Sequence, residues 1–229
     1  MQILHKAEER GAANLDWLKT RYSFSFANWF NPEKMGFGAL RVINDDLIAP
    51  HSGFPMHGHK DMEIITIVKS GRITHSDNMG NKDISISKGE IQVMSAGTGV
   101  LHAEMNDEDV PLSLFQIWIE PNTKNVAPRY DQKKIPTQEN AITQLIGSME
   151  SGAPLKIHQD AFISSFSGNK EISYKKEKPD HGVYVFAIKG KARVNGTALS
   201  GKDALGILGE EIIVMPEDYV EILFFEVPM

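Results

Sequence analysis

The chain has 229 residues, of which 41% are hydrophobic, and this length and composition suit one large domain or two small ones rather than a disordered chain. It contains no cysteine, which excludes disulfides, thiolate metal sites and cysteine nucleophiles. The net charge of −6 comes without a run of Lys or Arg and argues against direct binding to nucleic acid.

In chain order, the first predicted element is a helical turn over LDWLKT, with Asn14 as its cap. Short apolar runs divided by Gly, Asn, Asp and Pro then predict strands, and few long helical patterns interrupt them. The segment QENAITQLIGSME, residues 138–150, is predicted as a short helix or a loop. The predicted strands are ALRVIN, MEIITIVK, ISISK, EIQVMSA and LSLFQIWIE in the first half, and LKIHQ, GVYVFAIKG, KARVNG, EIIVMP and EILFFEV in the second.

The two halves share a rhythm of strand, Gly, hairpin turn and strand, which indicates a duplicated β-barrel. The segment PNTKNVAPRYDQKKIPTQEN, residues 121–140, is rich in Pro and Lys and is interpreted as the connector. We therefore expect an all-β protein with an N-terminal barrel in residues 1–130, which binds metal, and a C-terminal barrel in residues 131–229, which does not.

Two pairs of polar residues in the first half suggest a metal site. His57 and His59 are one residue apart, as are His102 and Glu104, so each pair faces one way from an extended strand. Three imidazoles and a carboxylate suit a first-row divalent metal such as Fe, Mn, Co, Ni, Cu or Zn, and the ligand types do not choose among these. His75 is interpreted as a polar residue near the site that resembles a ligand without being one.

Several residues have a simpler interpretation as structural residues. Phe24, Phe26, Trp29 and Phe30 are predicted to pack in the core rather than stack on a substrate, and Met56, Met62 and Met94 to fill the barrel. Gly97 and Gly99 are predicted to form a tight turn that leads to His102, because no helix follows them to make a phosphate loop.

These residues resemble two motifs of the cupin superfamily. The motifs run from His57-Gly-His59 through Glu63 and Gly71, and from Gly89 and Gly97 through His102 and Asn106. More narrowly, FSFANWFNPEKMGFGALRVINDD, HGHKDMEIITIV, HSDNMGN, VMSAGTGV and HAEMN resemble the pirin family, especially its bacterial two-cupin members. The resemblance implies a bicupin fold and one metal in the N-terminal barrel, with Fe(II) the usual ion.

The same resemblance implies quercetin 2,3-dioxygenase activity, in which a flavonol ring is opened with O2 and carbon monoxide is released. It favours Glu104 over Glu63 as the fourth ligand, and Glu63 is then expected to orient an imidazole. Glu104 is also the expected catalytic base. The alternative is a pirin-like regulatory protein that binds metal and acts through a protein partner without catalysis.

The expected partners are therefore a small aromatic substrate and O2. No apolar run approaches the roughly 18–20 residues that cross a bilayer. We expect a cytoplasmic monomer that binds neither membrane nor nucleic acid directly.

Overall fold

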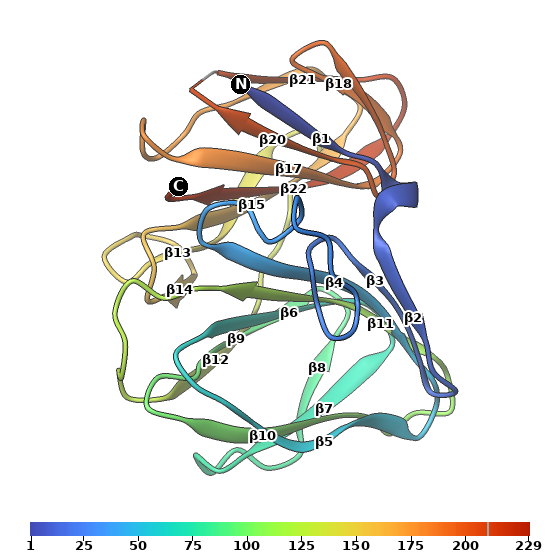
Figure 1. The fold of residues 1–229 in the computed structure, drawn as a ribbon, viewed down its shortest axis with the longest axis vertical. Helices are drawn as coiled ribbons and strands as arrows, with labels where there is room; N and C mark the ends of the chain where they lie inside the picture. The colour runs from blue at the N-terminus through green and yellow to red at the C-terminus, as the bar shows by residue number, and fades with distance from the viewer. Residues whose placement is uncertain (210) are drawn as a thin grey trace.

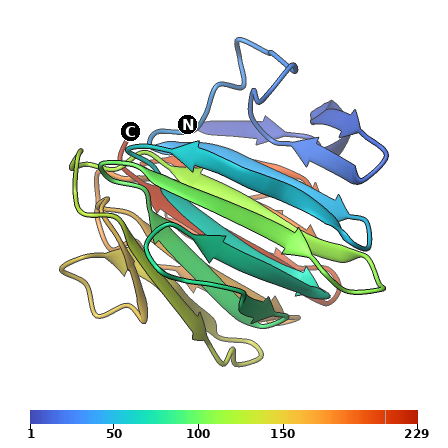
Figure 2. The same cartoon turned by 90° about the horizontal axis from the view of Figure 1, so that it is seen from below.

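The structure, a computed structural model, describes residues 1–209 and 211–229. These residues form 22 strands and one short 3-10 helix, η1 (Ala7–Glu9). The strands make two stacked barrels, and each barrel combines a seven-stranded sheet with a four-stranded sheet (Figure 1). Figure 2 shows the strands of these sheets side by side in layers. The prediction of an all-β chain with two barrels is confirmed.

The N-terminal barrel is built from an antiparallel large sheet and a small sheet opposite it. The large sheet has the order β12 (Arg129–Lys134), β9 (Glu90–Ser95), β6 (Glu63–Ser70), β11 (Leu112–Ile119), β4 (Leu40–Ile48), β3 (Leu18–Tyr22) and β2 (Gly11–Asn14). The small sheet has the order β5 (Ser52–His59), β10 (Val100–Asn106), β7 (Arg72–Asp77) and β8 (Ile84–Ser87).

The C-terminal barrel repeats this plan. Its large sheet has the order β1 (Gln2–His5), β20 (Ala204–Leu208), β17 (Gly182–Lys189), β22 (Val220–Val227), β15 (Phe162–Gly168), β13 (Ile142–Ser148) and β14 (Leu155–Ile157). Its small sheet has the order β16 (Ile172–Tyr174), β21 (Ile212–Pro216), β18 (Lys191–Val194) and β19 (Thr197–Ser200). Strand β1 therefore belongs to this barrel although it comes first in the chain, and it lies beside β20 in Figure 1.

A hydrophobic core joins the two large sheets. It contains Ile43, Ile65 and Phe115 from the N-terminal barrel together with Tyr184 and Phe186 from the C-terminal one, and all five are at most 1% exposed. Burial of large aromatic and aliphatic side chains is the main favourable term in folding. The two barrels are thus fixed to each other by a shared core.

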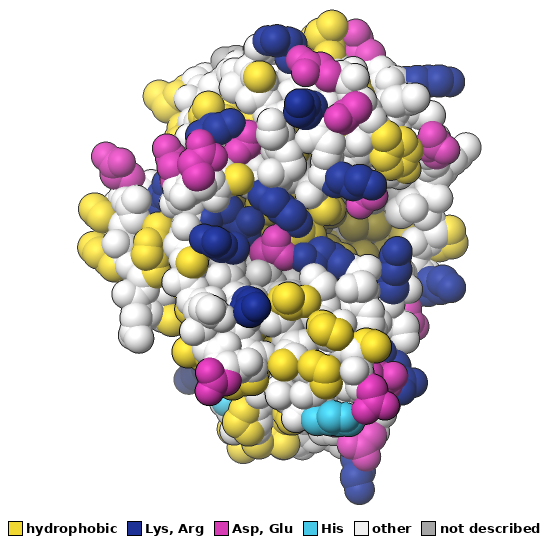
Figure 3. Space-filling view, turned by 90° about the vertical axis from the view of Figure 1, so that its right-hand side faces the viewer, with side chains coloured by type: hydrophobic (Ala, Val, Ile, Leu, Met, Phe, Trp, Pro, Cys, Tyr) yellow, Lys and Arg dark blue, Asp and Glu magenta, His cyan; other side chains and the backbone are white. Residues whose placement is uncertain are grey.

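An ion cluster lies next to this core. Asp45 of β4 pairs with Lys69 of the same barrel and, at 3.1 Å, with Lys202 of the other barrel. Both ammonium groups also lie over the ring of Phe115, at 4.4 and 4.8 Å from its centroid. Figure 3 shows Lys and Arg side chains across the middle of one face, interspersed with Asp and Glu.

Two local predictions are wrong. LDWLKT forms no helical turn: Leu15 and Leu18 exchange backbone hydrogen bonds and close a tight hairpin between β2 and β3. The segment 138–150 contains the strand β13, whose residues Leu145 and Ile146 are buried in the shared core. Pairing with β15 and burial decide both the strand and its register there, so tertiary contacts override the local pattern.

The predicted connector 121–140 is partly a strand, since β12 pairs with β9 over its whole length. A domain boundary between residues 130 and 131 falls within β12. We propose that the N-terminal domain extends through Lys134, because β12 completes its large sheet. Among the residues that the structure describes, no helix is long and apolar enough to cross a membrane.

The inner faces of the two large sheets differ in chemistry. In the N-terminal barrel, cross-strand neighbours form a polar row on five adjacent strands, whose members are Tyr22, Asn44, Gln116, Thr66 and Gln92. The C-terminal barrel is instead filled by an apolar cluster, in which Tyr174 stacks on Phe224 with ring centroids 4.6 Å apart. The row of polar side chains across five strands therefore belongs to the N-terminal barrel, while Tyr174 of the C-terminal barrel donates to the buried Glu226 at 3.0 Å.

Candidate metal centre

Three histidines from two neighbouring strands meet on the small sheet of the N-terminal barrel. His57 and His59 alternate on β5, and the antiparallel register places His102 of β10 opposite His57. The ring centroid of His102 lies 4.4 Å from that of His57 and 5.0 Å from that of His59. One ring nitrogen from each residue lies within 4.8 Å of the other two, so the three imidazoles are close enough to share an ion.

The turn before β10 helps to place His102. Gly97 has a φ of +45°, which favours glycine, and a Cβ there would lie 2.0 Å from the carbonyl oxygen of Val126. The backbone N–H of Gly99 donates to the carbonyl of Ala96 at 2.9 Å and closes the turn. The predicted tight turn at Gly97 and Gly99 is confirmed.

The ring nitrogens are prepared to bind a cation. Nδ1 of His57 lies 2.7 Å from the carbonyl oxygen of Pro55, which can only accept, so Nδ1 donates and Nε2 is the nitrogen available to a metal. His102 is 1% exposed, and its two ring nitrogens have no hydrogen-bond partner in the described part of the chain. An unpaired buried polar group is costly, and a metal ion would satisfy it.

The electrostatics favour neutral imidazoles. Burial, with a contribution from the neighbouring histidines, lowers the pKa of His59 to about 4 and that of His102 to about 3. Both rings are therefore neutral at pH 7, which is the form that binds a metal.

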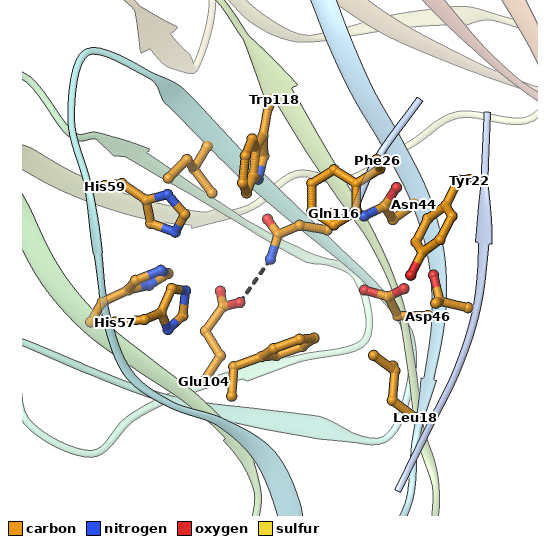
Figure 4. A pocket seen from close by; sticks show the side chains of 14 residues that line it. Leu18, Tyr22, Phe26, Asn44, Asp46, His57, His59, Glu104, Gln116 and Trp118 are labelled. Carbon is orange, nitrogen blue, oxygen red and sulfur yellow. Dashed lines mark hydrogen bonds between the residues drawn. The ribbon is translucent and has the colours of Figure 1, made fainter. Parts of the chain in front are cut away.

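Glu104 lies deeper, on the floor between the two sheets. It is 1% exposed and accepts three hydrogen bonds from the large sheet. The donors are Thr66 Oγ1 at 3.1 Å and Gln92 Nε2 at 3.2 Å to Oε1, and Gln116 Nε2 at 2.7 Å to Oε2. Figure 4 shows the bond from Gln116. The polar row of the large sheet thus fixes the position of this carboxyl group by donating to both of its oxygens.

Glu104 belongs to a second possible ligand group, which also contains His75. Ligand atoms of His75, His102 and Glu104 lie within 4.8 Å of one another and form a second group, which has His102 in common with the first. His75 is fully buried, and its Nε2 lies 3.0 Å from Oδ2 of Asp77. The structure therefore brings the three predicted histidines together and places Glu104 beside His102, but it does not place Glu104 in one compact group with His57 and His59.

A cavity of about 200 Å³ opens beside the cluster. His57, His59, His102 and Glu104 all line it, and aromatic and aliphatic walls extend from them. These walls are Leu18, Phe26, Phe54, Ile64 and Trp118. The ring of Phe26 meets that of Trp118 edge-on, with centroids 5.3 Å apart. A cavity of this kind accepts a small flat apolar molecule next to the candidate metal site.

The sequence matches known families along most of its length. Residues 4–119 match the family model Pirin, and residues 145–227 match the model of the quercetinase C-terminal cupin domain. Quercetin 2,3-dioxygenase of Escherichia coli (strain K12) is 42% identical over 231 aligned residues, which cover 100% of this chain and 99% of that protein. A pirin-like protein of Caulobacter vibrioides is 41% identical, with 91% of each chain covered. The chain belongs to the pirin family.

Solved pirin structures agree with this assignment. The crystal structure of the bacterial pirin YhhW from Escherichia coli, in complex with nickel(II), matches this pirin with a TM-score of 0.93 at 39% identity, covering 100% of this chain and 99% of that one. A structure of GK1651 from Geobacillus kaustophilus has the same fold, with a TM-score of 0.82 at 19% identity and coverage of 99% and 96%. The bicupin fold inferred from the resemblance is confirmed.

Glu63 does not take either of the roles considered for it. It precedes Ile64 on β6, and because Ile64 lines the cavity, Glu63 faces the opposite side of the sheet. There it accepts a hydrogen bond from Ser95 Oγ at 2.7 Å, and it belongs to neither ligand group among the described residues. Glu63 is thus neither a ligand nor the partner of an imidazole in this structure.

Burial gives Glu63 a testable effect on stability. Burial raises its pKa to about 7 from 4.5. A raised pKa means that the native state is stabilised by the protonated carboxyl below about pH 4.5 and loses this contribution as pH rises through 7. We expect Glu63→Gln to raise the free energy of unfolding by ~1–3 kcal/mol at pH 8 and to change it little at pH 4.5. Thermal melts across this pH range measure the effect.

The matched control is Glu139→Gln, which changes an exposed carboxyl in the same way. Its difference from the parent protein should stay small at every pH. A Glu63→Gln protein that is equally stable or less stable than the parent at pH 8 would contradict the interpretation.

The core-packing prediction for the aromatic residues after β3 holds only in part. Phe24 is buried in the shared core, but Phe26 lines the cavity and Phe30 is 70% exposed. Met94 is buried as predicted, whereas Met56 is 54% exposed. The irregular loop before β4 decides the positions of Phe26 and Phe30, and its path has no periodic pattern in the sequence.

Sequence reasoning missed the polar row of the large sheet. The available signal is a polar residue in the middle of a hydrophobic strand, as with Thr66 in MEIITIVK, Gln92 in EIQVMSA and Gln116 in LSLFQIWIE. A buried polar group at such a position needs a partner inside the barrel. The identity of that partner, Glu104, follows only from the register of the sheets.

Proposed function

We propose that this pirin is a metal-dependent dioxygenase that opens the heterocyclic ring of a flavonol such as quercetin with O2 and releases carbon monoxide. The observation that carries this proposal is the cavity, in which three imidazoles and a buried carboxylate face aromatic walls. The name of the Escherichia coli relative, quercetin 2,3-dioxygenase, supports the same activity over the full length of the chain.

The proposed metal ligands are His57, His59, His102 and Glu104. Their nitrogen and oxygen donors fit a divalent first-row metal, and the unpartnered nitrogens of His102 supply a reason for one to bind. The nickel(II) complex of YhhW supports a divalent ion, and we propose Fe(II), with Mn, Co, Ni, Cu or Zn as alternatives. When bound, the ion supplies the Lewis acidity and redox reactivity that the reaction with dioxygen requires.

Glu104 is the proposed general base. A flavonol must lose the proton of its 3-hydroxyl, and the Glu104 carboxylate is the acceptor at the floor of the cavity. Thr66, Gln92 and Gln116 donate to it, so its oxygens are fixed in position before the substrate arrives. This arrangement moves the proton without a large rearrangement of the chain.

The walls of the cavity are proposed to orient the substrate. Phe26, Phe54 and Trp118 offer aromatic surface for a flat ring system and exclude water from the reacting atoms. At about 200 Å³ the cavity is smaller than the ~300–1,000 Å³ of sites that enclose drug-sized ligands, so part of a three-ring flavonol would extend through the mouth.

We also propose that the protein acts as a cytoplasmic monomer on a small aromatic substrate and O2. The core between the barrels is made by one chain, which supports a self-sufficient monomer. The net charge of −6 and the mixed charges of the face in Figure 3 support an absence of direct nucleic-acid binding.

The test is turnover of quercetin by protein loaded separately with Fe(II), Mn, Co, Ni, Cu or Zn, with oxygen uptake and carbon monoxide as readouts. We expect turnover with at least one metal and its loss in Glu104→Gln, which keeps the size of the side chain but removes the base. Stoichiometric metal binding without turnover for any metal would overturn the flavonol reaction. That result would favour a regulatory protein that acts through a protein partner.

A further inference from the structure

A second polar cluster lies across the cavity from the histidines. Thr20 and Tyr22 on β3 face the same way as Asn44 and Asp46 on β4, because the register pairs Thr20 with Asp46 and Tyr22 with Asn44. All four side chains line the cavity. Figure 4 shows the labelled members on the opposite side of the cavity from His57 and His59, with the Asp46 carboxylate pointing inward and the Tyr22 hydroxyl directed to the same place.

Two polar atoms of this cluster are buried but unsatisfied. Thr20, Asn44 and Asp46 are 3–4% exposed. Asn44 Oδ1 and Asp46 Oδ1 have no hydrogen-bond partner in the part of the chain that the structure describes, whereas the Thr20 hydroxyl interacts with Asp46 and Tyr22 inside the cluster. Buried polar groups are nearly always paired, because leaving one unpaired costs free energy. Two such acceptor atoms, at alternate positions of β4 and in one cavity, indicate a place prepared for a ligand.

The free groups define the chemistry of that ligand. A carboxylate oxygen and an amide oxygen both accept hydrogen bonds, so the ligand must donate. Burial raises the pKa of Asp46 to about 6, while the hydrogen bond from Thr20 lowers it. A hydrogen bond to a buried carboxylate is stronger than one between neutral groups. The aromatic walls between this cluster and the histidines fit a flat aromatic ring. The hydrogen-bond donor that such a ring can present to Asp46 is a phenolic hydroxyl.

We propose that Asp46, with Asn44 and Thr20, forms a subsite that binds a phenolic hydroxyl of the substrate remote from its metal-binding group. Thr20, Asn44 and Asp46 are buried, whereas Phe26, Phe54 and Trp118, which line the same cavity, are partly exposed. The subsite therefore selects polyhydroxylated aromatic substrates over analogues that lack the distal hydroxyl. This inference rests on the proposed function, from which it takes the binding of the other end of the substrate to the metal.

The test is anaerobic calorimetry with Fe(II)-loaded protein and two probes. Quercetin carries several phenolic hydroxyls, and 3-hydroxyflavone carries only the 3-hydroxyl. We expect the unaltered protein to bind quercetin at least about 10-fold more tightly, as one hydrogen bond to a buried charge would give. Asp46→Leu should reduce that preference to less than about 3-fold and leave the affinity for 3-hydroxyflavone nearly unchanged.

Asp109→Asn is the control, because it changes an exposed aspartate of the same barrel and should keep the full preference. Equal binding of the two probes by the unaltered protein, failure of both to bind, or an unchanged preference in Asp46→Leu would overturn the subsite. If Asp46→Leu does not fold, the affinities of Asp46→Asn and of the unaltered protein for quercetin and 3-hydroxyflavone serve as the test. Tighter binding of quercetin without its turnover would support the subsite and reject the proposed reaction. Turnover of quercetin without tighter binding would support the reaction and reject the subsite.

Discussion

His102→Ala is expected to lower the affinity of the protein for a divalent metal by at least about 100-fold. His102 is the residue that the two possible ligand groups share, and it is closest to the centre of the cluster, 4.4 Å from His57 and 5.6 Å from His75 between ring centroids. Loss of a residue that only supports a ligand already costs 10–100-fold, and loss of a ligand should cost more. Competition with a chelator and the metal content after dialysis measure the effect.

Metal binding should also stabilise the fold. Saturation with a metal at about 100 times its dissociation constant should raise the melting temperature of the unaltered protein by roughly 5–10 °C and that of His102→Ala hardly at all. His51→Ala is the matched control, since His51 is exposed and pairs with Asp109 away from the cluster. An unchanged metal affinity in His102→Ala would rule out both ligand groups.

Two further variants separate the groups. If the ion sits among His57, His59 and His102, then His57→Ala should lose the metal and His75→Ala should retain it. The opposite result would place the ion with His75 and Glu104.

Gln116→Leu is expected to reduce kcat by about 10–100-fold while metal content and KM change little. Gln116 Nε2 donates the shortest of the three hydrogen bonds to Glu104, at 2.7 Å to Oε2, and Leu has a similar size but no donor. The carboxylate would keep its bonds to Thr66 and Gln92 through Oε1 only, so its orientation toward the substrate proton would be lost. General-base catalysis contributes about 10²–10⁴-fold, and partial loss of positioning should remove part of it.

The control is Gln144→Leu, which removes a Gln-to-Glu hydrogen bond of 3.2 Å, to Glu177, in the C-terminal barrel. It should leave kcat unchanged. A full-rate Gln116→Leu enzyme would show that Glu104 needs no support from the large sheet, and a variant without metal would show instead that Gln116 stabilises the metal site.

The fold class and the three histidines could be predicted from the sequence because both rest on local periodicity. An alternation of two residues puts His57 and His59 on one face, and the same rule applies to His102 and Glu104. The relation between those pairs depends on sheet register, including the irregular pairing between His102 and Glu104, which no local pattern encodes. The membership of Glu104 in one ligand group with His57, His59 and His102 therefore stays a prediction.

The supporting and substrate-facing residues were harder to foresee. Asn44, Thr66 and Gln116 come from three strands that are far apart in the sequence and adjacent in the sheet. Thr66 and Gln116 are polar residues between apolar neighbours, and Asn44 precedes two aspartates. Only the pairing of β4, β11 and β6 shows that the three form one row. Glu63 illustrates the converse, because its place in a family motif suggested the metal site while the strand alternation turns it toward the other barrel.

The pairing of β1 with β20 has a consequence for how the chain folds. Gln2 pairs with Ile207 and His5 with Ala204, so the first strand is synthesised long before the strand that receives it. Until then β1 has no edge to join, and the C-terminal sheet cannot be completed by its own segment alone. Contacts between residues so far apart in the sequence slow folding, because the chain loses conformational entropy before these contacts form and stabilise it. We therefore expect folding to finish after synthesis rather than barrel by barrel, and a separated C-terminal half would expose β20 as an open edge prone to aggregation.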